Sequence, residues 1–150
     1  MEYLRQFIRE VIKEDSSSFT GAGIIVVKQG KDGLRFLGLK TQKGLDIPKG
    51  GTDPGETPME TALRETFEEA SLSNADLKFQ WGKPSVKLNG RLILFLASTN
   101  STPAIGINPK TKEKEHDGFE WFSFEDIEKS CLPYLKPAIR WANSVILNKE

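Results

Sequence analysis

Residues 50–72 read GGTDPGETPMETALRETFEEASL, and this stretch carries the strongest local structural signals in the chain. Thr57 suits a helix N-cap, Pro58 suits the first helical position, and Glu60 completes the spacing of a capping box. The apolar residues that follow recur at the spacing of a helix that is buried on one face. The stretch therefore predicts a helix over residues 57–70.

This helix is expected to have one apolar face and one acidic face. The residues predicted to pack are Met59, Leu63, Thr66, Phe67 and Ala70. Glu65, Glu68 and Glu69 cluster within roughly 100° of arc on the other side. Exposed like charges at this spacing repel by about a few tenths of a kcal/mol per pair. Three such carboxylates indicate a site for Mg²⁺ or Mn²⁺, which prefer oxygen ligands, and a solvated acidic face is the alternative.

Composition sets limits on the class of protein. The chain has 150 residues, 37% of them hydrophobic, which is enough for one domain with a single core and excludes a fully disordered chain. No apolar run approaches the ~20 residues of a membrane span. The charged N-terminus lacks the apolar core of a signal peptide, so the expected location is the cytoplasm. The single His116 and single Cys131 cannot form a zinc site, so any metal must be bound by oxygens.

The formal net charge of zero conceals a local asymmetry. Residues 50–72 carry six carboxylates against Arg64, whereas residues 77–114 carry seven cations against Glu113. If both segments line one cleft, the carboxylates would bind divalent cations and the basic residues an anionic substrate such as a polyphosphate. Ordinary solvated charge is the alternative interpretation.

The other elements follow from periodicity and turn signals. We predict an amphipathic helix at 3–12, strands at 23–27 and 34–40, paired strand-like runs at 77–86 and 91–98, a loop at 100–109, a strand at 119–122, and helices at 124–131 and 133–148. Asn89-Gly90 between the two runs is a strong hairpin signal. Interleaved strands and helices indicate an α/β protein with a mixed sheet covered on both faces. We divide the chain into an N-terminal helical extension, residues 1–17, and a domain, residues 18–150. The extension is a candidate for dimerisation, so monomer and homodimer both stay open.

The opening stretch resembles the Nudix box, whose pattern is G-x5-E-x7-R-E-U-x-E-E-x-G-U with U a bulky apolar residue. The matching positions are Gly50, Glu56, Arg64, Glu65, Glu68, Glu69 and Leu72. Thr66 stands at an apolar position of the pattern, and Ser71 replaces its last glycine. Ser71 matters only if that residue must adopt a positive φ. The resemblance implies the Nudix fold, an α/β/α sandwich with a mixed sheet, and an enzyme that hydrolyses a nucleoside diphosphate linked to another group.

The resemblance also implies roles for individual residues. The implied metal ligands are Glu65, Glu68 and Glu69, with Arg64 orienting them and Glu56 in a supporting position. The backbone carbonyl of Lys49 would reach the same Mg²⁺ or Mn²⁺ ions. The implied chemistry is attack of a metal-activated water on phosphorus. Which glutamate acts as the base is left open.

Two further patches are similar to the branch that cleaves diadenosine tetraphosphate into ATP and AMP. Residues 48–56 match its P-K-G and P-G-E run, and residues 115–121 match its E-H-x-x-x-x-W element. The match implies that Glu115 is a fourth metal carboxylate and that Lys49 contacts a phosphate. His116 is a candidate phosphate contact, with structural hydrogen bonding as the alternative.

The base-stacking residue is not evident, because Leu45 and Leu94 stand where that branch has aromatic side chains. The alternative substrate is the 5′ end of RNA, cleaved by a pyrophosphohydrolase or decapping enzyme. Its candidate contacts form a basic stripe, namely Lys83, Lys87 and Arg91 with Lys110, Lys112 and Lys114. Zero net charge weighs against extended RNA binding. Two other options are a diphosphoinositol polyphosphate hydrolase and a non-catalytic nucleotide sensor, and the sensor would be favoured only if box glutamates were missing.

Overall fold

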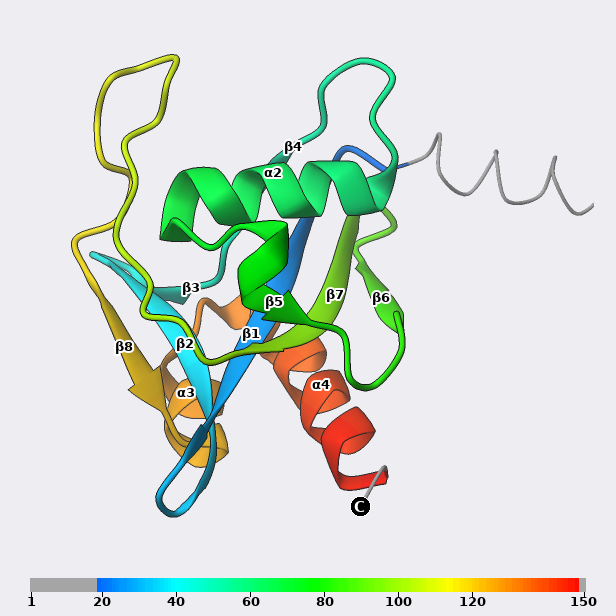
Figure 1. Ribbon diagram of the computed structural model, residues 1–150, viewed down its shortest axis with the longest axis vertical. Coiled ribbons are helices and arrows are strands. Elements are labelled where there is room, and N and C mark those ends of the chain that lie inside the picture. Colours follow the sequence, from blue (N-terminus) through cyan, green and yellow to red (C-terminus); the bar gives the residue numbers. More distant parts are fainter. Residues whose placement is uncertain (1–18, 149–150) are drawn as a thin grey trace, which may run out of the picture.

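The computed structural model describes residues 19–148, so the predicted helix at 3–12 and the extension 1–17 lie outside the described residues. In chain order the elements are β1 (Gly21–Gly30), β2 (Gly33–Thr41), β3 (Gly44–Asp46), β4 (Lys49–Gly51), α2 (Pro58–Ala70), η1 (Asn74–Asp76), β5 (Leu77–Lys78), β6 (Ser85–Leu88), β7 (Leu92–Thr99), β8 (Phe119–Phe122), α3 (Phe124–Ser130), η2 (Pro133–Leu135) and α4 (Lys136–Asn148). Figure 1 shows the sheet between α2 on one side and α3 with α4 on the other.

The strands form one mixed sheet. Its main order is β3-β2-β1-β7-β5, with β4 paired to β1, β6 to β7 and β8 to β2. β1 and β7 run parallel, and the other pairs are antiparallel. The predicted α/β class, the mixed sheet and the α/β/α sandwich are therefore confirmed.

The central strand β1 is apolar and buried from Gly21 to Val27, because both of its faces are covered there. Ile24 and Val26 pack in one core cluster with Ala62 of α2. Ile25 and Val27 pack in the other cluster, which holds residues of α3 and α4 such as Ile139. Successive side chains of a strand point to opposite faces, so a single strand serves both cores.

The predicted hairpin at Asn89-Gly90 forms, with both residues at positive φ, 53° and 68°. β7 pairs with β6 across this turn and also with β5. The run predicted over 77–86 is interrupted, because residues 79–84 leave the sheet between the two short strands. The predicted terminal helix at 133–148 likewise divides into the 3₁₀ turn η2 and the helix α4.

Helix α2 begins as predicted, with Thr57 as N-cap and a complete capping box to Glu60. Its buried residues are Thr61, Ala62, Thr66, Glu69 and Ala70, and Met59 and Leu63 are partly buried against the same core, so the predicted packing of Met59, Leu63, Thr66 and Ala70 is confirmed. The prediction that Phe67 packs was wrong, because its side chain is 58% exposed.

Candidate active site

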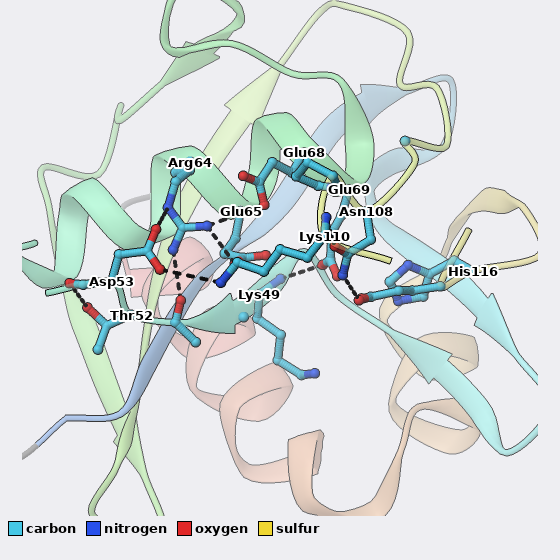
Figure 2. A pocket seen from close by; sticks show the side chains of 15 residues that line it. Lys49, Thr52, Asp53, Arg64, Glu65, Glu68, Glu69, Asn108, Lys110 and His116 are labelled. Carbon is cyan, nitrogen blue, oxygen red and sulfur yellow. Dashed lines mark hydrogen bonds and ion pairs between the residues drawn. The ribbon is translucent and has the colours of Figure 1, made fainter. Parts of the chain in front are cut away.

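A pocket of ≈ 280 Å³ lies where α2, β4 and the segment between β7 and β8 meet. Its walls include Arg64, Lys49 and His116 and the four predicted metal carboxylates, Glu65, Glu68, Glu69 and Glu115. In Figure 2 Arg64, Glu65, Glu68 and Glu69 extend from the helix, Lys49 lies on the strand below it, and Asn108 and His116 come from the segment on the right. The fold therefore brings Glu115 to the glutamates of α2.

Arg64 connects α2 with the loop before it. Its Nε donates to Glu56 Oε2 at 2.8 Å, and its Nη2 donates to Glu56 Oε1 at 3.0 Å and to the Gly51 carbonyl at 2.8 Å. Its Nη1 donates to Glu65 at 2.8 Å and to Glu68 at 3.3 Å. A planar guanidinium can hold several carboxylates at once in this way. The hydrogen bond from Arg64 is the main reason that the pKa of Glu56 falls to about 2.

Glu65 and Gly50 lie in direct contact. A Cβ atom at position 50 would displace the Glu65 carboxyl group, so glycine lets this carboxylate keep its present position. Burial raises the pKa of Glu65, and the nearby Arg64 only partly opposes that effect. Gly50 therefore lets a carboxylate approach the β4 backbone closely.

Glu69 and Glu115 form a carboxyl pair. Glu69 is only 9% exposed and accepts a hydrogen bond from the backbone N–H of Lys49 at 2.9 Å. Burial, followed by the hydrogen bond to Glu115 and its charge, raises the pKa of Glu69 to about 9. The pKa of Glu115 is lowered by the hydrogen bonds from Glu69 and Asn108. At neutral pH Glu69 therefore holds the proton and donates it to Glu115.

The segment that carries Glu115 is attached to the end of α2. The N–H groups of Ala104 and Gly106 donate to the carbonyls of Ala70 and Glu69, at 2.9 and 3.1 Å, and so satisfy acceptors that the helix leaves unpaired. Asn108 Nδ2 donates to Glu115 Oε1 at 2.5 Å. We did not predict Asn108 as a site residue, because it lies in an irregular loop and no spacing relates it to Glu115.

The donor set fits a hard divalent cation. As the side chains stand, no three His, Cys, Asp or Glu groups within residues 19–148 form a metal site, and Glu65 and Glu68 both accept hydrogen bonds from Arg64. The grouped donors are nonetheless all oxygens, the preference of Mg²⁺ and Mn²⁺. The pair of Glu69 and Glu115 shares one proton, and a bound cation would favour its loss because cations lower the pKa of adjacent acids.

Lys49 and His116 both contact Asp46, a residue that we did not single out from the sequence. His116 is 4% exposed, with Nε2 3.1 Å from Asp46 Oδ2. Lys49 Nζ lies 3.1 Å from Asp46 Oδ1 and 5.7 Å from the centre of the Tyr134 ring. In Figure 2 the Lys49 side chain extends away from the glutamates. The burial of His116 favours the structural alternative for this residue.

The basic stripe is divided between two places. Lys110 lines the pocket, with Nζ 3.8 Å from Asp53 Oδ1. Lys83, Lys87 and Arg91 do not line it, because β6 and its turn lie beyond β7 at the sheet edge. Lys112 and Lys114 do not line the pocket either, so the expectation that the acidic and basic segments share one cleft holds for Lys110 and not for the rest of the stripe. Any role of theirs in substrate binding stays a prediction.

Comparison with known proteins agrees with this fold. The model of the Nudix domain family matches residues 18–142. The chain therefore belongs to the Nudix family.

Among curated relatives, the chain is 26% identical over 116 residues to the asymmetrical bis(5′-nucleosyl)-tetraphosphatase of Sus scrofa, covering 68% of this chain and 73% of that protein. It is 37% identical over 87 residues to Nudix hydrolase 3 of Caenorhabditis elegans, covering 55% of this chain and 34% of that protein. It is 28% identical over 100 residues to the RNA pyrophosphohydrolase of Proteus mirabilis, covering 55% and 57%. The chain thus spans well under two thirds of the length of the last two relatives.

A solved structure with the same fold is an Ap4A hydrolase of Caenorhabditis elegans in a binary complex, with a TM-score of 0.66 and 22% identity over 87% of this chain and 98% of that one. A Nudix hydrolase of Listeria monocytogenes aligns with a TM-score of 0.67 and 20% identity, covering 87% and 95%. At these identities the likeness establishes the fold alone. Within residues 19–148, no helix is long and apolar enough to cross a membrane.

Proposed function

We propose that this protein is a pyrophosphohydrolase that uses Mg²⁺ or Mn²⁺ and cleaves diadenosine tetraphosphate into ATP and AMP. The observation that supports this proposal most strongly is the convergence of Glu65, Glu68 and Glu69 of α2 with Glu115 from a distant segment. The relative from Sus scrofa is named for this type of substrate. The proposal of the general reaction, hydrolysis of a nucleoside diphosphate linked to another group, rests on the box residues. The proposal of the specific substrate rests on the weaker resemblance of residues 48–56 and 115–121 to the diadenosine tetraphosphate branch.

The carboxylates would hold the cation, with the Lys49 carbonyl as a further ligand. When bound, the cation would stabilise charge on the phosphate oxygens and lower the pKa of the attacking water. Arg64 keeps Glu65 and Glu68 on the pocket side of α2. Glu69 would release its shared proton on binding the cation. Lys110, at the pocket wall, would neutralise phosphate charge.

The pocket of ≈ 280 Å³ is smaller than most sites that enclose a whole organic ligand. It would therefore take the metal and the phosphates, and the bases would lie outside it. Tyr134 is 41% exposed and lies beside Lys49, so its ring offers a face on which a purine can stack. We propose Tyr134 as the base-stacking residue that Leu45 and Leu94 do not supply.

The test is a substrate panel with Mg²⁺, containing diadenosine tetraphosphate, ADP-ribose, nucleoside triphosphates, diphosphoinositol polyphosphate and 5′-triphosphate RNA. Glu69→Gln removes a ligand charge with little change of shape, and we expect it to lower kcat by at least about 100-fold. Glu60→Gln is the matched control, because it alters the same helix outside the pocket and keeps a capping side chain. Products are identified by chromatography and folding by circular dichroism.

Formation of ATP and AMP by the wild type and not by folded Glu69→Gln is the expected result. Most of the wild-type turnover in Glu69→Gln at saturating Mg²⁺ would contradict its role as a required ligand. The second candidate, a 5′-pyrophosphohydrolase of RNA, is supported by the similarity to the Proteus mirabilis enzyme. Preferential cleavage of triphosphate RNA would establish it instead. Nucleotide binding without cleavage of any substrate would favour a sensor.

A further inference from the structure

Asp46 occupies a buried position directly beneath the pocket. It ends β3 and is 8% exposed, yet it does not line the pocket itself. Its Oδ1 accepts a hydrogen bond from the Ile47 N–H at 2.8 Å. The flanking side chains of Leu45 and Ile47 are apolar and buried, so Asp46 is the polar side chain that β3 places here.

The two other contacts of Asp46 lead to opposite walls of the site. One contact is with Lys49 Nζ at 3.1 Å, and the backbone N–H of Lys49 donates to Glu69. The other contact is with His116 Nε2 at 3.1 Å, and His116 directly follows Glu115. Asp46 therefore joins the strand that contacts Glu69 to the segment that carries Glu115.

The charge distribution keeps this arrangement in place. Burial alone raises the pKa of Asp46, but the hydrogen bond with His116 and the charge of Lys49 outweigh it, so the pKa lies below its ordinary value. Burial lowers the pKa of Lys49, while Asp46 and Tyr134 raise it to a greater combined extent. The carboxylate and the ammonium thus both stay charged, and a buried pair with good geometry holds its partners firmly.

We propose that Asp46 is a positioning residue for phosphate binding and hydrolysis. Its carboxylate holds the Lys49 side chain at the rim of the pocket, and with it the backbone N–H that contacts Glu69, and it fixes His116, so that Glu115 faces Glu69. Asp46 acts through these neighbours and touches no substrate atom. The proposal rests on the proposed function, in that it assumes a phosphate ligand in this pocket.

The test is a double-mutant cycle with Asp46→Asn, Lys49→Met and the double variant. The readouts are the KM and kcat for the substrate found in the panel and the affinity for inorganic tripolyphosphate with Mg²⁺, measured by calorimetry. Each single variant should weaken tripolyphosphate binding and raise KM by about tenfold, the loss of one charged hydrogen bond. The double variant should lose less than the product of the two single losses, because Asp46 acts in part through Lys49 and in part through His116. Asp126→Asn, an exposed acid on α3, is the matched control.

His116 is the single histidine of the chain, so its ring gives one set of NMR signals that reports the contact with Asp46 directly. We expect these signals to shift in folded Asp46→Asn and to stay unchanged in Asp126→Asn. If Asp46→Asn does not fold, His116→Gln tests the contact between Asp46 and His116 in its place. That variant should raise the Mg²⁺ concentration for half-maximal activity severalfold.

The proposal would be overturned if Asp46→Asn kept the wild-type KM and the wild-type affinity for tripolyphosphate. It would also be overturned if the losses in the double variant were the full product of the two single losses, or if the NMR signals of the His116 ring did not shift in Asp46→Asn. A wild type that does not bind tripolyphosphate would also overturn it. If the wild type binds tripolyphosphate but cleaves no nucleotide, the proposed function fails while the binding cycle still tests Asp46.

Discussion

At the scale of single residues, the two departures from the box pattern have different physical consequences. Thr66 is fully buried in α2, and its hydroxyl group has no hydrogen-bond partner among the described residues. An unpaired buried hydroxyl destabilises the fold, which explains why the pattern has an apolar residue there. Ser71 ends α2 in the left-handed conformation, with φ 58° and ψ 29°. This conformation is strained for serine and free of strain for glycine.

Ser71→Gly should stabilise the protein. Removing the Cβ relieves the left-handed strain, and part of that gain is offset by the greater flexibility of glycine in the unfolded chain. We expect the free energy of unfolding to rise by about 0.5–1 kcal/mol, measured by urea denaturation. Ser71→Ala keeps the Cβ and is the control, for which no such gain is expected. A less stable glycine variant would show that the serine hydroxyl contributes more than the strain costs.

At the scale of elements, α2 is the framework of the site. Its capping box and its apolar spacing are local, so its position along the chain was predicted correctly from residues 57–70. Arg64 then fastens the preceding loop to the helix through Glu56 and the Gly51 carbonyl. These hydrogen bonds of Arg64 hold the segment between β4 and α2, which forms one wall of the pocket.

Glu56→Gln should change how stability depends on pH. The pKa of Glu56 in the folded protein is about 2 against an ordinary value of 4.5. Because this pKa is depressed, the interaction with Arg64 stabilises the fold fully above the ordinary value and is lost as the pH falls toward 2. We expect a contribution on the order of 1 kcal/mol, allowing for solvent screening. The free energy of unfolding, measured across this range, should fall more steeply for the wild type than for Glu56→Gln.

Glu125→Gln, at an exposed position on α3, is the control for Glu56→Gln and should keep the slope of the wild type. Identical slopes in Glu56→Gln and the wild type would show that the link between Arg64 and Glu56 does not stabilise the fold.

At the scale of the whole molecule, the sheet brings together segments that are distant in the chain. β4 pairs with the start of β1, which places Lys49 and Gly50 beneath α2. The segment before β8 is held by β2, since Lys40 N–H donates to the Gly118 carbonyl at 2.8 Å. Glu69 and Glu115 therefore meet at one end of the sheet. The close contact of two carboxyl groups lowers the stability of the fold when both are charged.

The repulsion between Glu69 and Glu115 predicts that metal binding and the stability of the fold are coupled. The pKa of Glu69 is raised to about 9, so in metal-free protein the stability it supports is complete below its ordinary pKa of 4.5 and is lost as the pH rises toward 9. At about pH 8 with EDTA, Glu69→Gln should therefore be more stable than the wild type, by on the order of 1 kcal/mol. Adding Mg²⁺ should raise the Tm of the wild type more than that of the variant, because the ion binds only the folded state.

Calorimetric scans with EDTA and with Mg²⁺ measure this coupling. Glu60→Gln, outside the pocket, should respond to Mg²⁺ as the wild type does. An equal Mg²⁺ shift of Tm in the wild type and in Glu69→Gln would contradict the role of Glu69 as a ligand.

Features that depend on neighbours along the chain could be predicted from the amino-acid sequence. The capping box of α2 and the hairpin at Asn89-Gly90 depend on residues only a few positions apart, so local spacing is enough to predict them. The cluster of glutamates on α2 is local in the same sense. Glu115 was assigned to this cluster by resemblance to a known branch, since nothing in its own surroundings indicates the contact with Glu69.

The remaining features were decided by the tertiary structure. Phe67 lies on the exposed side of α2 although its spacing places it near the apolar face, and Lys83, Lys87 and Arg91 lie outside the pocket. The contact between Asp46 and His116 joins residues 70 positions apart. Burial and hydrogen-bond partners arise only when distant segments pack, and these surroundings determine the pKa and orientation of each charged group. The chain thus specifies by itself which chemical groups are present, while packing decides which of them act together.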